Sequence, residues 1–155
     1  MNPMRRFVVM LCTLILLLSG SGSARAQLTA LAVSGSPATM TISSAAAGNG
    51  PSAVTNSATT YFVRVRNGAG IMKITAEINA LMPTGTTLAV SLVAPAGATS
   101  LGAVSLDQTA RDVVVNIAKE NGATNAITYT FSATVAAGVV AVQSRSVTLT
   151  LTSFP

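Results

Sequence analysis

The stretch that decides the fold is residues 126–154, which read AITYTFSATVAAGVVAVQSRSVTLTLTSF. Apolar and hydroxyl side chains alternate from Ile127 to Val135, and the same alternation returns from Val147 to Leu151. Strict period-2 alternation places one set of side chains on a core face and the other set toward water, as in a half-buried β-strand. The stretch therefore predicts two strands, which we expect to pair as a terminal hairpin.

The connection between these two strands carries an irregularity. Apolar residues occupy odd positions in both strands, whereas Val140 and Val142 between them occupy even positions. A shift of one residue moves every side chain of a strand to the opposite face. A β-bulge or an irregular loop is therefore expected near residues 143–146.

The rest of the chain repeats the alternating pattern in short runs. Candidate strands lie at residues 28–34, 38–43, 59–66, 71–80, 87–93, 101–106 and 112–119, and residues 45–57 read as a loop. Gly, Pro and Asn cluster between the runs, and no helical period appears after residue 27. Seven to nine short strands at intervals of roughly 8 to 12 residues predict an all-β fold, an antiparallel immunoglobulin-like β-sandwich.

The runs 59–66 and 71–80 are expected to form a hairpin. A four-residue loop at residues 67–70 would place core residues opposite core residues and Arg64 opposite Lys73. A two-residue Asn67-Gly68 turn would keep the same parity, so the choice between the two loops depends on turn chemistry.

The N-terminal residues have the composition of an export signal. A basic start that includes Arg5 and Arg6 precedes an apolar run of about a dozen residues and a small-x-small site, Ala24-Arg25-Ala26. The apolar run is shorter than the roughly 20 residues of a membrane-spanning helix. We expect a cleaved signal peptide at residues 1–26, with Ala24 and Ala26 as cleavage residues, and a single domain at residues 27–155. Such a protein would be secreted, periplasmic or at the cell surface, and would meet the membrane only during export.

The composition excludes several kinds of active site. The chain has no His and no Trp, and its one cysteine, Cys12, lies in the expected leader. Ser-His-Asp and Cys-His catalysis and sites with His or thiolate ligands are therefore excluded from residues 27–155. Six basic and four acidic residues give this part a net charge of +2, against +5 for the whole chain. So small a charge, with few aromatic residues, argues against nucleic acid. We expect no catalytic residue, no metal site and no cofactor.

Two carboxylates lie close together in the sequence. Asp107 and Asp112 are separated by four residues that include Arg111. They could form a glycosidase-like pair, or one could bind calcium together with loop carbonyls. Neutralisation of one of them by Arg111 at a solvated loop is the preferred interpretation.

One group of residues suggests a binding surface. Arg64, Arg66 and Lys73 would share the outward face of the expected 59–80 hairpin with Phe62. They could bind an anionic glycan or an envelope component; alternatively, they blunt an exposed sheet edge or meet acids on a neighbouring strand. This basic strand face is the candidate ligand site that the sequence favours.

With these residues in view, the chain resembles secreted bacterial β-sandwich proteins of the fimbrial-subunit and spore-coat-U type. The resemblance rests on the leader, the Thr-rich short strands and the final Tyr129-Thr-Phe131…Val147-Thr-Leu-Thr-Leu151 pair, and it departs from the families in lacking the cysteine pair that many members carry. It implies an exported structural or surface-interaction domain without an active site, whose partners would be proteins at the cell surface or other copies of itself.

The core pattern gives two further expectations. Phe131 should be among the most buried residues, facing Val147 or a near neighbour across the terminal hairpin. Leu31 and Val33 should pack into the core of their own sheet, because two strong apolar side chains are few for a strand donated to another subunit. A monomer or weak oligomer is therefore expected.

Overall fold

The structure is a computed structural model that describes residues 29–45 and 49–155. The expected signal peptide, with Ala24 and Ala26, lies outside the described residues. The described part contains nine strands and one 3₁₀ turn: β1 (Ala30–Ser34), β2 (Val54–Val65), β3 (Met72–Ile78), β4 (Thr86–Leu92), β5 (Thr99–Ser100), β6 (Val104–Ser105), β7 (Arg111–Ile117), β8 (Glu120–Ala133), η1 (Val135–Ala137) and β9 (Val147–Ser153). The expected all-β fold of seven to nine strands is confirmed for this part of the chain.

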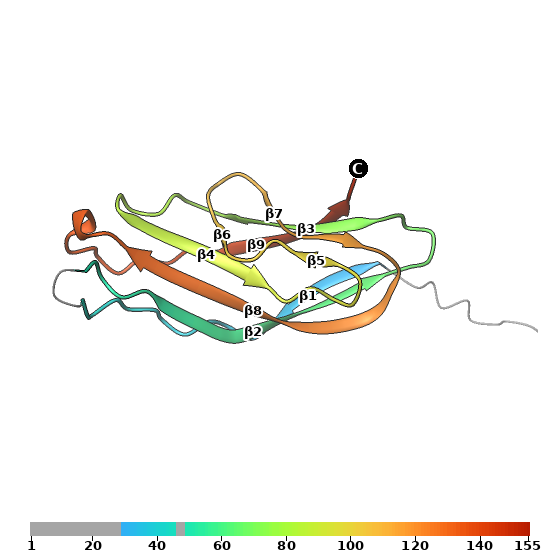
Figure 1. Ribbon diagram of the computed structural model, residues 1–155, viewed down its shortest axis with the longest axis horizontal. Coiled ribbons are helices and arrows are strands. Elements are labelled where there is room, and N and C mark those ends of the chain that lie inside the picture. The colour runs from blue at the N-terminus through green and yellow to red at the C-terminus, as the bar shows by residue number, and fades with distance from the viewer. Residues whose placement is uncertain (1–28, 46–48) are drawn as a thin grey trace, which may run out of the picture.

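The strands form two antiparallel sheets that lie face to face (Figure 1). The first sheet has five strands in the order β1-β2-β8-β4-β6, and the second has four in the order β5-β7-β3-β9. The chain crosses between the two sheets repeatedly, so most of its strands pair with partners that are distant in sequence.

One apolar core fills the space between the sheets. The first sheet contributes alternate residues of β2, β4 and β8, such as Tyr61, Val90 and Ile127, each 0% exposed. The second sheet contributes fully buried Ile74 and Val113. Burying apolar surface on both inner faces is the main stabilising term of such a two-layered fold. The alternation in the sequence describes the first sheet's contribution well, whereas β3 and β7 each bury three consecutive residues where their pairing is irregular.

The expected hairpin at residues 59–80 is not formed. β2 pairs with β1 and β8 in the first sheet, whereas β3 pairs with β7 and β9 in the second. Residues 66–71 carry the chain from one sheet to the other. Both strands still direct their apolar residues toward the same core, which is why their sequence pattern matches that of a hairpin.

The expected terminal hairpin is also not formed, because its two strands lie in different sheets. β8 lies in the centre of the first sheet and β9 at an edge of the second. Alternation within each strand is confirmed: Ile127 and Tyr129 are buried, and β9 exposes Thr148 and Thr150 but not its apolar residues. Phe131, however, is only half-buried and pairs with Leu88 of β4 and Val54 of β2.

Other boundaries follow or miss the sequence pattern for local reasons. β1 pairs with β2 within its own sheet, as expected, and Leu31 packs on the core while Val33 remains 51% exposed. Residues 38–43 are not a strand, and β2 begins at Val54 inside the expected loop. Residues 138–146 are irregular, which confirms the break expected before β9.

The two sheets differ in length, and this difference creates a concave feature at one end of the described structure. β2 and β8 have 12 and 14 residues, whereas the strands of the second sheet have at most 7. At about 3.3 Å per residue, the longer strands extend some 17 to 23 Å farther. Figure 1 shows the excess at the left, where β2, β8 and the start of β4 project beyond β3 and β9. Only non-strand segments cover the inner face there.

Candidate functional site

The structure does not bring the four sequence-predicted binding residues onto one strand face. Phe62, Arg64 and Arg66 lie on or just after β2 in the first sheet, whereas Lys73 lies on β3 in the second. The shared face required the 59–80 hairpin, which is absent. Arg64 is therefore not opposite Lys73, and the expected group separates into two parts.

Arg64 and Phe62 each have a structural partner. The Arg64 Nε–H donates to the carbonyl of Asn121 at 3.1 Å, next to an irregularity in the β2–β8 pairing. The Phe62 ring lies over Gly122, whose φ of +131° is a conformation that side-chain-bearing residues avoid, and a Cβ there would come within 2.9 Å of the ring. An aromatic ring across a glycine of the neighbouring strand is a known device for closing a sheet surface.

Lys73 is neutralised by an acid on the neighbouring strand. Its Nζ lies 3.0 Å from Oδ1 of Asp112 on β7 and 6.0 Å from the centre of the Phe154 ring. Arg64 and Arg66 are exposed, and neither forms an ion pair within the described residues. Of the predicted basic group, these two arginines alone keep an uncompensated charge.

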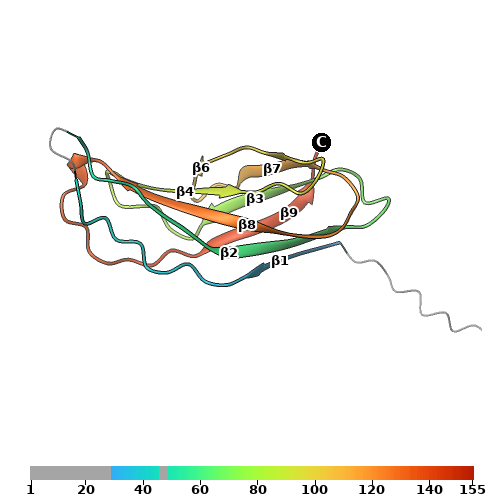
Figure 2. The same cartoon turned by 60° about the horizontal axis from the view of Figure 1, so that its bottom comes forward.

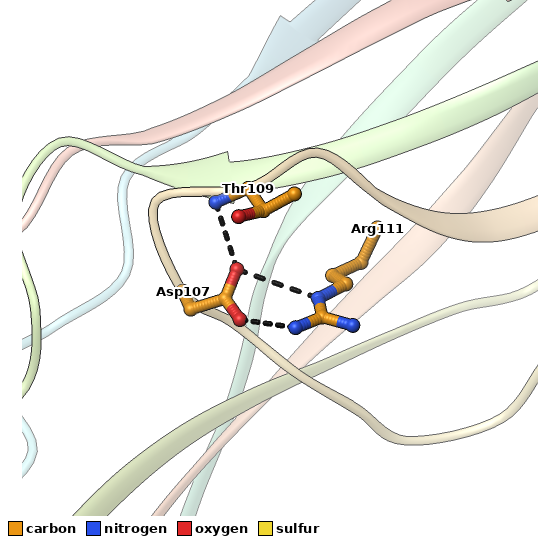
Figure 3. A network of polar contacts seen from close by, with 3 residues as sticks. All are labelled: Asp107, Thr109 and Arg111. Carbon is orange, nitrogen blue, oxygen red and sulfur yellow. Dashed lines mark hydrogen bonds and ion pairs between the residues drawn. The ribbon is translucent and has the colours of Figure 1, made fainter.

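The second carboxylate is also held by a cation. Arg111 donates from Nε to Oδ1 of Asp107 at 3.4 Å and from Nη2 to Oδ2, while the backbone N–H of Thr109 donates to Oδ1 at 2.8 Å (Figure 3). The hydrogen bonds from Arg111 and then from Thr109 lower the pKa of Asp107, and the carboxylate in turn raises the pKa of Arg111. The preferred interpretation of Arg111 is confirmed.

These two ion pairs bear on the catalytic and calcium-binding alternatives for Asp107 and Asp112. A general acid needs a raised pKa, whereas the pKa of Asp107 is lowered. Within residues 29–45 and 49–155, no three side chains of the metal-binding types lie together.

A groove lies at the projecting end of the first sheet. It has a volume of about 1140 Å³ and is open to solvent. Inward-facing residues of β4 and β8 form its floor: Thr86, Leu88, Tyr129, Phe131 and Ala133. Residues 37–45 and 140–145 form its walls, and Met82, just before β4 in the chain, also lines it. We call this feature the groove; its volume slightly exceeds the 300 to 1,000 Å³ usual for small-molecule sites.

The walls lie outside the named strands, and only an isolated bridge between Ala45 and Pro51 pairs the end of the first wall. Met40 and Ile42 are half-buried in the first wall, and the neighbouring Thr39 and Thr41 are exposed. This is the alternating run that the sequence assigned to a strand at residues 38–43. Val140 lies in the second wall, in the segment where the sequence parity changes. Figure 2 shows both segments running toward the same end of the molecule.

Two hydroxyl groups lie at the inner end of the groove. Thr59 is 1% exposed, and its Oγ1 makes no hydrogen bond of normal geometry; Tyr129 is 6% exposed. Burial raises the pKa of the Tyr129 phenol, and the nearby Thr59 hydroxyl offsets part of that effect. A buried hydroxyl without a partner is costly. A water molecule or a polar atom of an occupant would satisfy it.

One charged side chain, that of Arg145, is found among the described residues that line the groove. The Arg145 guanidinium donates from Nε and Nη2 to the carbonyl of Leu81, at 3.2 and 2.7 Å, and from Nη1 to the carbonyl of Ser144 at 2.8 Å. Nη2 also donates to Oε1 of Gln143. All these acceptors are neutral, and Arg145 forms no ion pair within the described residues. The groove therefore combines an apolar floor with an uncompensated positive charge.

Sequence reasoning missed the groove, although two of its signals are in the sequence. The parity change before Val147 marks the irregular wall, and Met40 with Ile42 marks a run that alternates without a paired neighbour.

No helix in the described part is long and apolar enough to cross a membrane. Comparison of the chain with protein-family models, curated proteins and solved structures finds no match.

Proposed function

We propose that the protein is an exported immunoglobulin-like β-sandwich that works as a structural or surface-interaction domain and has no active site. The observation that carries the proposal is the contrast between its two kinds of surface feature. The two aspartates that could have served catalysis are bound to Arg111 and Lys73, whereas the groove is open, apolar and free of carboxylates. We propose the groove as the principal interaction site.

Export is supported by the N-terminal sequence, with its basic start, apolar run and Ala24-Arg25-Ala26 site. The immunoglobulin-like assignment is supported by two antiparallel sheets around one core. A relation to fimbrial-subunit and spore-coat-U proteins fits these features and the Thr-rich β8 and β9. The proposal places the protein outside the inner membrane, with protein or envelope partners or further copies of itself.

The proposal is tested by looking for turnover. Purified protein is incubated with ester, glycoside and peptide substrates, beside the variants Asp107→Asn and Asp112→Asn. The proposal expects no turnover above that of a heat-denatured sample. Hydrolysis that either substitution abolishes would overturn it, because it would give a carboxylate a catalytic role.

A second candidate is a binding module for anionic glycans, now limited to Arg64 and Arg66 beside Phe62. The observation that favours it is that both guanidinium groups are exposed without an ion pair among the described residues. Arg64→Ser with Arg66→Ser should remove retention on immobilised heparin and its dependence on salt. Lys73→Ser is the matched control, since Lys73 lies on the other sheet. Unchanged retention in the double variant would end this candidate.

A further inference from the structure

We propose that the groove binds a single-chain anionic amphiphile of the fatty-acid type, with its carboxylate at Arg145 and its alkyl chain across the floor. The inference rests on the proposed function in that it treats the groove as the interaction site. It adds the chemical class of the occupant.

The floor provides the apolar contact. Leu88 and Phe131 are direct neighbours across the β4–β8 pairing, and both face inward. Met40, Ile42 and Met82 contribute flexible or branched apolar side chains from the walls. Methionine adapts its shape to an occupant better than stiff side chains do. The long sheet end offers an extended surface, which suits a linear chain better than a compact ring system.

The charge selects the head group. Among the described residues that line the groove, Arg145 is the only charged one, and none of them is a carboxylate. Four of its five N–H groups donate to neutral acceptors, which leaves one Nη1 hydrogen and the full positive charge. An anionic oxygen would accept that hydrogen and compensate the charge. A cationic head group would be repelled.

The inner end of the groove agrees with an amphiphilic occupant. The unpartnered Thr59 hydroxyl and the Tyr129 phenol make this end polar, while the floor between it and the outer rim is apolar. Water retained at Thr59 would satisfy that hydroxyl beneath a bound chain. An extended apolar peptide is the other occupant that such a groove accepts, but a peptide has no necessary negative charge for Arg145.

The experiment uses protein purified after expression of the full chain and titrates it with laurate, dodecanol and dodecyltrimethylammonium, each below its aggregation concentration. We expect the order of affinity laurate, dodecanol, dodecyltrimethylammonium. Arg145→Gln should weaken laurate about tenfold or more, as loss of a hydrogen bond to a charged group predicts, and change dodecanol by less than about twofold. Arg145→Lys should recover part of the laurate affinity, and Lys119→Gln, which removes an exposed cation outside the groove lining, should change the affinity for neither ligand.

Equal weakening of laurate and dodecanol by Arg145→Gln would overturn the inference, because Arg145 would then only hold the wall in place. Absence of laurate binding would also overturn it, and so would a peptide with the sequence of residues 28–34 binding where laurate does not. If Arg145→Gln fails to fold, the order of the three ligands on the unaltered protein decides. None of these outcomes is a turnover, so the failure of this inference is distinct from the failure of the proposed function.

Discussion

Truncation of two apolar residues on the same face of β8 separates the packed core from the groove. Ile127 is 0% exposed in the core, whereas Phe131, four residues farther along, is half-buried on the groove floor. Ile127→Ala removes three carbon groups, worth about 0.8 kcal/mol each, and leaves an enclosed cavity worth about 1 kcal/mol more. The expected loss of unfolding free energy is about 3 to 4 kcal/mol.

Phe131→Ala removes a larger side chain but should cost less. The ring already borders an open groove, so part of its surface is exposed and no enclosed cavity forms on its removal. We expect a loss of about 1 to 2 kcal/mol, below the 3 to 5 kcal/mol typical of a fully buried Phe. The larger residue would then be the less important one for stability.

Urea unfolding followed by far-UV circular dichroism measures both losses, provided that each variant shows one transition with an unchanged m value. A cost for Phe131→Ala equal to or above that for Ile127→Ala would refute the reasoning. It would mean that other segments cover the floor and that the groove is part of the core.

Three further outcomes are expected. Burial raises the pKa of Tyr61 to about 12, so the phenol stabilises the fold fully below its unfolded pKa near 10, and this stabilisation is lost as pH rises toward 12. Tyr61→Phe should lower the free energy of unfolding by about 1 kcal/mol at neutral pH, and in urea titrations it should flatten the loss of stability at alkaline pH. Gly122→Ala should cost about 2 to 3 kcal/mol of stability in thermal unfolding, because the new Cβ meets the Phe62 ring. Gly97→Ala should cost about 1 kcal/mol, because Gly97 also has a positive φ but open space around it. Equal costs would disprove the role of the ring. The pKa of Asp107 is lowered from 3.8, so its ion pair stabilises the fold above that value, and this stabilisation is lost as pH falls through the folded pKa. Asp107→Asn should remove this part of the slope of unfolding free energy against pH on the acid side. An unchanged slope would contradict the pairing.

The sequence predicts the strands and their faces better than it predicts their partners. Alternation at Tyr61, Val63 and Val65 identifies a core face because side chains of a strand point to opposite sides in turn. It contains no information on which sheet holds the strand. Two consecutive strands on opposite sides of a core show the same pattern as a hairpin. The pattern therefore predicts a pairing of β2 with β3 and of β8 with β9 that the structure does not have.

The candidate site was less accessible to sequence reasoning. The predicted basic group requires a hairpin of residues 59–80, which the structure does not form, so Lys73 does not share a surface with Arg64. The groove arises because β2 and β8 are longer than the strands they face, a property of two sheets together and not of either sequence run. Asp107 and Arg111 were easier to predict, because their interaction lies within one short loop.

Thiol labelling tests most directly whether the inner face of the first sheet is open at its projecting end. The part of the chain after the expected leader has no cysteine. Ala133→Cys on the groove floor and Ala76→Cys in the core therefore each add one thiol to this part. Peptide mapping separates the label on each new thiol from the label on Cys12. Both alanines face inward, but Ala133 lines the groove and Ala76 is 0% exposed. We predict rapid labelling of Ala133→Cys in the native protein, slowed by laurate, and labelling of Ala76→Cys only through global unfolding. Equal protection of the two thiols would contradict the open groove and the function proposed for it.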